Sequence, residues 1–323
     1  MQELLESSEA QNGDLQITVA VRQPDQAEMF SSKGVRAILI TGLDDADGLE
    51  NAARDHDIVI NAGTGQHTEA PKALIRGLGT RKQQTGQEGH FIHLSGTTNI
   101  AVPNITPSPY QLRDFSDEDD DLYEYEKSRA AEDPYGQRVA DVVAIEEGIR
   151  FNVKTYIVMP PTVYGHGTGW FKKQSHQIPT LIRSAMKSGH AEYIGTGEVQ
   201  LGHVHVTDLA RLFGLLATKV VAGETVPSGR QGYYFTNSGS HTWLDVATLI
   251  GKAGFDLGVL ESPLPRSISL EEGAVRFADG DVKFAEACFA SRAFGLGWKP
   301  LHTEEDFKDS IRTTFEEIHN GGV

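Results

Sequence analysis

Cysteine is almost absent from the sequence: Cys288 is the only one in 323 residues, so an internal disulfide is excluded. The lack of disulfides is typical of a reducing compartment, and we expect the protein in the cytoplasm. Long apolar runs are missing too, since no stretch approaches the roughly 20 residues that span a bilayer, and we expect no membrane partner. The first residues, MQELLESSEAQNGD, are polar and acidic, and we expect no secretory signal there.

Positive charge is also scarce. The sequence has 29 Lys and Arg against 45 Asp and Glu, which gives a formal net charge of −16. Such a surface repels phosphates, so nucleic acid and anionic membranes are excluded as main partners, and we expect a small-molecule substrate. The charge also serves solubility. The densest acidic run, RDFSDEDDDLYEYEKS at 113–128, is typical of a solvated loop.

The first half of the chain alternates short β-rich runs with helical segments. Strands are predicted at 15–21, 35–40, 57–63, 90–96 and 153–160. These runs are apolar on both faces and have helices between them, a pattern that predicts a parallel sheet covered on both sides. Because crossovers are right-handed, the predicted fold class is α/β, with a doubly wound, Rossmann-like parallel sheet.

The second half is less regular. Helices are predicted at 178–189 and 242–254, and a strand that runs into a helix is predicted in GHVHVTDLARLFGLLATKV. This mixture indicates a smaller C-terminal α/β lobe for the substrate. We therefore expect a dinucleotide-binding domain at 1–165 and a substrate lobe at 166–323, with some segments of the lobe returning to the sheet.

Six short segments occur in an order and spacing that resemble one enzyme group. They are GLDDADGLENA (42–52), VINAG (59–63), HLSG (93–96), MPPTVYG (159–165), GHVHVTDLA (202–210) and LGWKP (296–300). Their series resembles the extended short-chain dehydrogenase/reductases, which include the NAD-dependent epimerase/dehydratases, and more narrowly the fungal NAD(P)-binding proteins of that group. The likeness covers most of the chain. It also allows a homodimer, since family members often pair through the two helices that flank the site.

One part of the family pattern is missing. The family begins with a strand and a glycine-rich turn, after which a helix N-terminus holds the pyrophosphate of the dinucleotide. The residues before the first predicted strand provide only the second half of a helix, and the GTG sequences at 63–65 and 195–197 cannot replace the turn. We therefore expect a truncated N-terminus that lacks on the order of 20 residues, judged from the length of a βαβ unit.

The catalytic residues of the family are a serine, a tyrosine and a lysine one helical turn after the tyrosine. The resemblance assigns Ser95 as the group that polarises the substrate oxygen and Tyr135 as the group that passes the proton. In the family the lysine lowers the pKa of the phenol, because a phenol of pKa about 10 is a poor base at neutral pH, and it also holds the nicotinamide ribose. Here Val139 stands at the lysine position, and Arg138 projects about 100° around the helix from it.

Structural alternatives exist for both catalytic candidates. Ser95 could satisfy loop backbone, and Tyr135 could be a pocket or helix-start tyrosine without a proton-transfer role. A literal Tyr-xxx-Lys pattern, Tyr123 and Lys127, occurs in the acidic run, but it lies too far before MPPTVYG for the family's spacing and fits a solvent-exposed turn.

The candidate cofactor-binding residues come from two strand ends. Asn61, Ala62 and Gly63 are small and follow a strand, which would let a cofactor approach the backbone, although a tight turn needs the same residue types. Arg22 ends the strand at 15–21, where a guanidinium suits a 2′-phosphate better than the ribose hydroxyls of NAD. The sequence therefore favours NADP over NAD, and the alternative is that no dinucleotide binds.

The segment at 159–165 supplies further candidates. The resemblance implies that Pro161, Thr162 and Val163 border the nicotinamide and that Tyr164 contacts the substrate. Thr97, close after Ser95, is a second hydroxyl for the substrate oxygen.

Two other groups remain. Trp170 and Phe171, in the cluster HGTGWFKKQSHQ, are expected to line a substrate pocket or lid. His203 and His205 alternate along a strand and point to opposite faces, so together with Asp208 they do not predict a metal site, which needs ligands that converge on one point.

Three functions fit these observations. The leading hypothesis is an NAD(P)-linked oxidoreductase or epimerase-type enzyme of the extended short-chain dehydrogenase class, with a degenerate catalytic motif, acting on a small organic molecule. The second is a cofactor-independent isomerase, lyase or cyclase on the same scaffold. The third is a non-catalytic regulator that senses a dinucleotide.

Overall fold

The computed structural model describes residues 1–7, 11–13, 15–103, 112–277, 284–285 and 287–322. It divides into two units that are each built from separate stretches of the chain. The first unit contains Met1–Asn99, Asp117–Met159 and Leu212–Tyr234, and the second contains Ile100–Ser116, Pro160–Arg211 and Phe235–Val323. The expected domain boundary at residue 165 stays a prediction.

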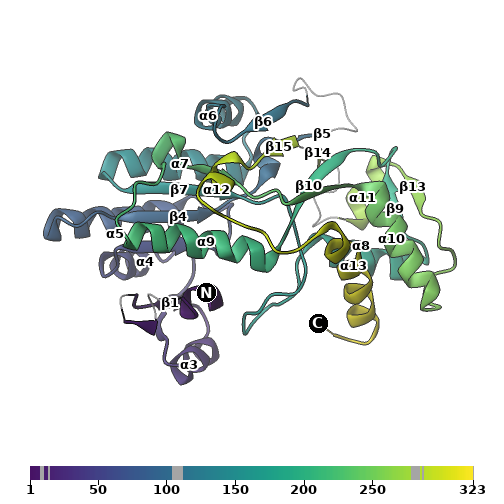
Figure 1. The fold of residues 1–323 in the computed structure, drawn as a ribbon, viewed down its shortest axis with the longest axis horizontal. Helices are drawn as coiled ribbons and strands as arrows, with labels where there is room; N and C mark the ends of the chain where they lie inside the picture. The colour runs from purple at the N-terminus through teal and green to yellow at the C-terminus, as the bar shows by residue number, and fades with distance from the viewer. Residues whose placement is uncertain (8–10, 14, 104–111, 278–283, 286, 323) are drawn as a thin grey trace. The chain divides into compact units, whose positions relative to one another are not determined.

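The first unit contains a four-stranded sheet in the order β11-β7-β4-β3. Figure 1 labels its two central strands, β7 and β4. Its strands are β3 (Ile58–Asn61), β4 (His90–Leu94), β7 (Lys154–Met159) and β11 (Tyr233–Phe235). β4 is parallel to both β3 and β7, with Ile92 opposite Ile60 on one side and Tyr156 on the other. Phe91, Ile92 and Ile157 have no exposed surface, as strands covered on both faces require. The predicted Rossmann-like fold class is confirmed.

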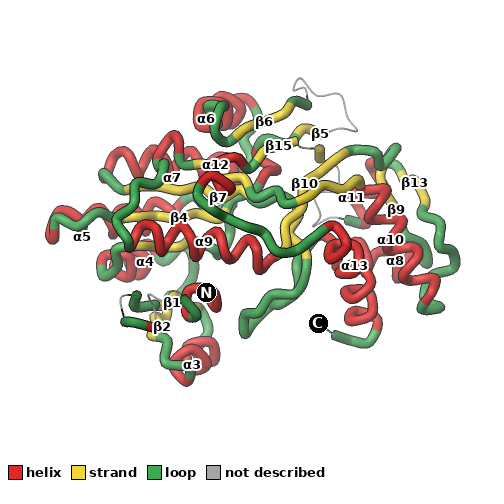
Figure 2. Tube along the Cα trace, in the orientation of Figure 1, coloured by secondary structure: helices red, strands yellow, loops and turns green. Residues whose placement is uncertain are grey.

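Helices connect and cover these strands (Figure 2). The main helices are α4 (Ala46–Arg54), α5 (Glu69–Thr85), α6 (Leu122–Glu132) and α7 (Gly136–Phe151). α5 packs against both α4 and α7, and α6 packs against α7. Asp45 caps α4, because its carboxylate accepts a hydrogen bond from the Gly48 N–H at 3.0 Å. Gly86 ends α5 with a φ of 76°, a left-handed conformation that glycine adopts without strain.

The first two predicted strands form a sheet of their own. β1 (Thr18–Val21) and β2 (Arg36–Leu39) are parallel, with Val19 opposite Ala37, and α3 (Pro24–Ser32) connects them. In the part of the chain that the structure describes, no strand pairs with the outer edge of β3. That edge is the position at which the family pattern has its first strand.

The second unit has the predicted mixed α/β content. Its sheet has the order β12-β10-β8, with β10 (Gln200–His205) parallel to β8 (Thr162–Tyr164) and antiparallel to β12 (Gly239–Thr242). Three amphipathic helices pack together in its core: α8 (Gln177–Ser188), α10 (Trp243–Asp256) and α13 (Glu304–His319).

The remaining elements are short, except α9. They are α1 (Gln2–Leu5), η1 (Thr97–Asn99), β5 (Val102–Pro103), β6 (Asp114–Ser116), β9 (Glu192–Ile194), α9 (Val206–Val221), η2 (Gly229–Gln231), β13 (Arg266–Ile268), α11 (Leu270–Arg276), β14 (Phe284–Ala285), β15 (Ala287–Phe289) and α12 (Ser291–Gly295). None of the described helices is long and apolar enough to cross a membrane.

The acidic run at 113–128 differs from its prediction. It was expected to be a solvated loop, but it contains β6 and the first seven residues of α6. Asp121 caps α6 by accepting a hydrogen bond from the Glu124 N–H at 3.0 Å. The loop prediction is therefore wrong for residues 114–116, which form a strand, and for residues 122–128, where carboxylates of this run cap and cover a helix whose other face is buried.

Candidate functional site

Ser95 lies directly after β4, as its strand-end pattern predicts. Its N–H donates to the carbonyl oxygen of Val158 at 2.8 Å, which continues the pairing of β4 with β7. The residue is only 5% exposed. Its Oγ hydroxyl is in short hydrogen-bond contact with Asp141 Oδ2 and accepts from Asn99 Nδ2 at 3.1 Å. Two side chains therefore fix the hydroxyl at the carboxyl end of the central strand.

A row of buried polar side chains extends from Ser95 through the interior of the first unit. Asp141, on α7, also accepts from Asn99 Nδ2 at 2.6 Å, and its Oδ1 lies 3.5 Å from His93 Nε2. The other ring nitrogen of His93 is 3.0 Å from Asn61 Nδ2. Asp141 and His93 have no exposed surface. Burial lowers the pKa of His93 to about 4, so its imidazole is neutral at neutral pH.

Glu126, on α6, is a second buried carboxyl in this network. Its Oε2 accepts from the Tyr233 hydroxyl at 2.9 Å. Burial raises the pKa of Glu126 to about 7, against the opposing effect of the Tyr233 hydrogen bond. Burial and the neighbouring Glu126 raise the pKa of Asp141 well above its ordinary value.

Tyr135 is the N-cap residue of α7, and the helix begins at Gly136. The Arg138 guanidinium carbon lies 5.7 Å from the centre of its ring. Arg138 is 2% exposed and donates to the carbonyl oxygens of Asn99 at 2.9 Å and Asp133 at 2.7 Å. A cation therefore faces Tyr135 from the third helical position, although Val139 occupies the position of the family's lysine.

Two turns and the start of α7 meet at the carboxyl edge of the sheet. A methyl group on Gly65, after β3, would lie 2.7 Å from Gln137 Nε2 and 3.0 Å from the Leu94 carbonyl oxygen. A methyl group on Gly96, after β4, would lie 3.1 Å from the same Gln137 nitrogen. The start of α7 is thus in contact with both strand ends, at the edge where doubly wound sheets bind their ligands.

The predicted cofactor residues that belong to the first unit lie on its surface or close beneath it. Ala62 and Gly63 are exposed, and a methyl group on Gly63 would meet only Asn61 Oδ1, at 3.8 Å. Asn61 is 8% exposed and uses its side chain to contact His93, as described above. Arg22 is exposed directly after β1, and Thr97 is buried in η1. Their roles remain predictions.

The candidates of the segment at 159–165 belong to the second unit. Thr162 and Tyr164 are 4% and 1% exposed, and Tyr164 packs edge-on against Phe307 at a centroid distance of 4.9 Å. Pro161 is buried and Val163 half-buried.

Trp170 and Phe171 lie in a loop that the hydrogen bond from the Gly167 N–H to the Lys173 carbonyl closes at 2.7 Å. Trp170 is half-buried and Phe171 is 37% exposed. The substrate and nicotinamide roles given to this segment and loop also remain predictions.

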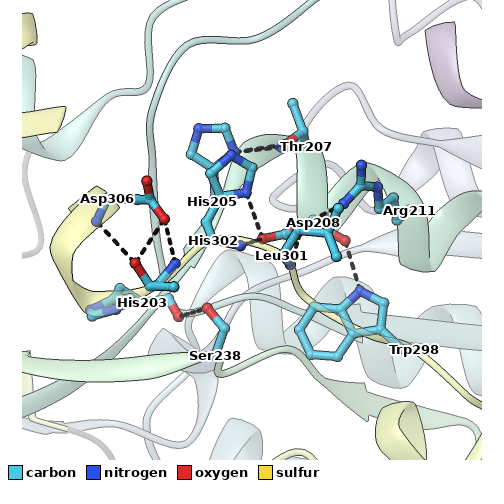
Figure 3. A network of polar contacts seen from close by, with 11 residues as sticks. His203, His205, Thr207, Asp208, Arg211, Ser238, Trp298, Leu301, His302 and Asp306 are labelled. Carbon is cyan, nitrogen blue, oxygen red and sulfur yellow. Dashed lines mark hydrogen bonds and ion pairs between the residues drawn. The ribbon is translucent and has the colours of Figure 1, made fainter. Parts of the chain in front are cut away.

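Figure 3 shows the polar network around Asp208, in the second unit. The buried Asp208 carboxylate accepts from the N–H groups of Leu301 and His302 at 3.0 Å and from His302 Nδ1 at 2.8 Å. The Trp298 indole donates to the Asp208 carbonyl oxygen at 2.8 Å. The segment around LGWKP is therefore tied to the helix that begins in GHVHVTDLA.

The histidines of that strand are packed as neutral rings. His205 stacks on His302 with a centroid distance of 3.5 Å, and His203 stacks on Phe307 at 4.1 Å. Burial lowers the pKa of both His203 and His205 to about 4. Among the described residues, no group of three or more His, Cys, Asp or Glu is placed to hold a metal ion.

The strand order and the helices that cover the sheet define a doubly wound, Rossmann-like α/β fold. Residues 90–228 match the model of the NAD dependent epimerase/dehydratase family, which confirms the resemblance inferred from the motifs. The oxidase ucsJ of an Acremonium species is 27% identical over 315 residues, which cover 89% of this chain and 86% of that protein.

Solved structures extend the similarity in fold to almost the whole chain. DesIV, a dTDP-glucose 4,6-dehydratase from Streptomyces venezuelae solved with NAD, has a TM-score of 0.62 at 15% identity and covers 95% of this chain and 88% of its own. UDP-glucuronic acid 4-epimerase from Bacillus cereus, solved with UDP-glucuronic acid and NAD, has a TM-score of 0.59 at 14% identity and covers 98% and 94%. At these identities the two structures support the fold alone.

Sequence reasoning missed the residues behind Ser95. Asp141 interrupts the apolar helix ADVVAIEEGI with a carboxylate six positions after Tyr135, a signal that could have been used. Glu126 gave no such signal, because it is one of many carboxylates in the acidic run. Gln137, which contacts both glycine turns, likewise carries no sequence pattern of its own.

Proposed function

We propose that this protein is an NAD(P)-linked oxidoreductase or epimerase-type enzyme that acts on the oxygen-bearing carbon of a small organic molecule. The observation that carries the proposal is the placement of Ser95: its hydroxyl is held by Asp141 and Asn99 at the carboxyl end of β4, next to the start of α7 and Tyr135. The family match over residues 90–228 includes both catalytic candidates and supports the reaction class.

The proposed roles follow from these contacts. Ser95 orients the substrate oxygen through its fixed hydroxyl, and Tyr135 gives or takes the proton of that oxygen. Arg138 provides the positive charge beside Tyr135 that the family places on a lysine. The Arg138 guanidinium also bonds two backbone carbonyls, so we propose that it positions Tyr135 and does not hold a nicotinamide ribose.

The residues at the sheet edge fit part of a dinucleotide. The open backbone at Ala62 and Gly63 admits a ligand, and the exposed guanidinium of Arg22 suits a 2′-phosphate, which favours NADP over NAD. We propose Pro161, Thr162 and Val163 as nicotinamide contacts, and Thr97, Tyr164, Trp170 and Phe171 as substrate contacts. When bound, the dinucleotide would accept two electrons from the substrate carbon or donate two electrons to it.

The first experiment titrates the purified protein with NADPH and with NADH and follows tryptophan fluorescence. We expect saturable quenching with NADPH at lower concentration than with NADH, and loss of that preference in Arg22→Ala. No binding of either dinucleotide would overturn the proposal and favour the cofactor-independent isomerase, lyase or cyclase. Binding without turnover on any of a panel of carbonyl compounds would favour the dinucleotide-sensing regulator.

The second experiment tests the two catalytic candidates. We expect Tyr135→Phe to lower kcat by about 10²- to 10⁴-fold, the usual contribution of a general acid or base, with the dinucleotide dissociation constant unchanged. Tyr193→Phe, a half-buried tyrosine of β9, is the matched control and should leave kcat unaltered. Equal activity of Tyr135→Phe and the control would remove Tyr135 from the mechanism.

A further inference from the structure

A cavity of about 550 Å³ lies at the amino edge of the sheet in the first unit. Ile58, His90 and Lys154 line it, and these residues begin the parallel strands β3, β4 and β7. Ser95 follows the other end of β4, and a rise of about 3.3 Å per residue separates it from His90 by about 16 Å. The cavity is therefore distinct from the carboxyl edge, where the catalytic candidates lie.

Side chains from the three strands lie side by side in this cavity. Ile58 is in register with His90, and His90 is in register with Lys154, so the three side chains point to the same face of the sheet. Because neighbouring strands are about 4.8 Å apart, these side chains span about 10 Å across the sheet. A ligand that lies across the strands meets an apolar side chain at one end, an imidazole in the middle and an ammonium group at the other end.

The imidazole of His90 forms a hydrogen-bonded pair with a buried phenol. Its Nδ1 lies 3.0 Å from the hydroxyl of Tyr156, which also lines the cavity and is only 2% exposed. Burial lowers the pKa of His90 and raises the pKa of Tyr156 to about 12, so the imidazole is neutral and the phenol keeps its proton. The two groups then carry one N–H and one O–H hydrogen, and their mutual hydrogen bond uses one of them. In either tautomer of His90, the second hydrogen is left for a ligand.

The charges around the cavity leave one lysine without a short ion pair. The three carboxylates that line the cavity are each paired with a cation outside the lining: Asp57 with Arg81 at 2.6 Å, Glu88 with Lys82 at 2.7 Å and Glu224 with Lys219 at 2.6 Å. Lys154 Nζ is 4.0 Å from Glu88 Oε2. The local charge is therefore positive, although the whole chain has a formal net charge of −16.

Valine side chains provide much of the remaining apolar lining. Val220 and Val221 are the last residues of α9, and Val226 lies in the segment after it. Val221 is 40% exposed, so it presents apolar surface that a ligand in the cavity would cover. Because removal of apolar surface from water is favourable, an aliphatic chain suits this part of the cavity.

We propose that the cavity binds a short aliphatic carboxylic acid as its anion. Lys154 pairs with one carboxylate oxygen, the second hydrogen of the His90–Tyr156 pair is donated to the other oxygen, and the alkyl chain covers Ile58 and Val221. An ammonium ligand would meet Lys154 and three carboxylates that already have cations, and a neutral alcohol would leave Lys154 without an anion. This binding site goes beyond the proposed function and does not depend on it.

Isothermal titration calorimetry of the full chain with sodium hexanoate tests the site. We expect saturable binding at one site, and binding of acetate, whose chain is shorter by four methylene groups, to be about 10- to 100-fold weaker. Hexylamine and hexan-1-ol, which replace the carboxylate by an ammonium and a hydroxyl group, should bind at least about tenfold more weakly than hexanoate. Heat without saturation, or hexylamine binding as tightly as hexanoate, would overturn the proposal.

Substitutions at exposed positions assign the binding to this cavity. Lys154→Gln should raise the dissociation constant of hexanoate about 10- to 100-fold, whereas Lys154→Arg keeps the charge and should change it by less than about threefold. Lys252→Gln, at an exposed lysine of α10, is the matched control and should leave it unaltered. Circular dichroism checks that each variant is folded. Equal affinities of Lys154→Gln and Lys252→Gln would remove Lys154 from the site and reject the proposal.

A second pair of variants tests the apolar part. Val221→Asp places a carboxylate where the alkyl chain should lie, so hexanoate should bind at least about tenfold more weakly. Val275→Asp introduces the same change at an exposed valine of α11 and should have no effect. Unchanged hexanoate binding in Val221→Asp would show that the chain does not lie in this cavity.

Tyr135→Phe separates this site from the proposed function. It should bind hexanoate with the same dissociation constant as the wild type, because Tyr135 lies near the other edge of the sheet. Loss of hexanoate binding in Tyr135→Phe would place the acid among the catalytic candidates and overturn the proposal. Hexanoate binding that depends on Lys154 in a protein without dinucleotide binding would contradict the proposed function and leave this site established.

Discussion

At the scale of single residues, Asp208 shows how one buried carboxylate can organise distant parts of the sequence. It lies at the start of α9 and receives hydrogen bonds from the backbone and side chain of residues more than 90 positions later in the chain (Figure 3). Burial alone would raise the pKa of Asp208, but the N–H groups of Leu301 and His302 hold it below its ordinary value. The carboxylate therefore stays ionised and fully satisfied.

Removing that charge should destabilise the protein. We expect Asp208→Asn to lower the free energy of unfolding by about 2–3 kcal/mol, because an amide cannot accept all of the hydrogen bonds that the carboxylate accepts. Asp309→Asn, an exposed position on α13, should change it by less than about 0.5 kcal/mol. Urea unfolding of both variants measures the difference, and similar values for the two would refute a structural role for Asp208.

Sequence alone identified the residues that lie directly next to a predicted strand or helix. Ser95 was found because it follows an apolar strand, and Tyr135 because it precedes a helix at the family spacing. The partners of Ser95 could not be found in this way: Asp141 lies 46 residues from Ser95 in sequence, and their contact depends on how α7 packs against the end of β4. The same holds for Arg138, whose guanidinium reaches Tyr135 only because its side chain folds back along the helix.

At the scale of elements, the contact between α4 and α5 depends on a missing side chain. Gly77 lies in the middle of α5 and is buried. A methyl group there would overlap the backbone oxygen of Glu50 and lie 2.8 Å from Ala53 Cβ. The first of these atoms belongs to the backbone of α4 and the second to a short alanine side chain. Neither can move unless α4 itself moves.

An added methyl group at this contact should therefore be costly. We expect Gly77→Ala to lower the free energy of unfolding by about 1–3 kcal/mol, the usual cost of overpacking, despite the better helix propensity of alanine. Gly295→Ala, in α12, meets nothing within 4 Å and should be neutral or stabilising by up to about 1 kcal/mol. Thermal unfolding of both variants compares them, and a stabilised Gly77→Ala would disprove the close approach.

The elements themselves were largely predictable. Strands β3, β4 and β7 begin and end within a few residues of their predicted limits, because their apolar runs are bounded by clear turn residues. The hydrophobic pattern did not predict which strands pair with one another. The strands predicted at 15–21 and 35–40 are present, but they form a separate sheet. Helix α6 was missed because its exposed carboxylates dominate the composition, while its buried face consists of a few scattered residues, among them Leu122 and Tyr123.

At the scale of the whole molecule, the two units carry different buried titratable groups. In the second unit, burial lowers the pKa of His203 and His205 to about 4 and that of His241 to about 3. The first unit contains His93, whose pKa burial lowers to about 4, but also Glu126, whose pKa burial raises to about 7.

The two shifts act on stability with opposite signs. A histidine whose folded-state pKa is depressed is protonated more readily in the unfolded state, so its contribution to stability is present above about pH 6.5 and is lost as pH falls toward 4. A carboxyl whose folded-state pKa is raised binds its proton more readily in the folded state, so stability increases as pH falls from about 7 to about 4.5. In the first unit the effect of the histidine on stability is partly cancelled by that of the carboxyl. In the second unit the effects of the three histidines have the same sign and add up.

We therefore expect mild acid to loosen the second unit before the first. Hydrogen exchange followed by mass spectrometry, corrected for intrinsic exchange rates, should show that peptides from β10 and β12 lose protection between about pH 6.5 and about pH 5, whereas those from β4 and α7 retain it. His241→Asn, which removes the most strongly shifted imidazole, should reduce the pH dependence of the second unit and leave that of the first unchanged. Earlier loss from β4 and α7 would mean that the buried carboxyls are ionised in the folded state, and it would contradict this partition of charge.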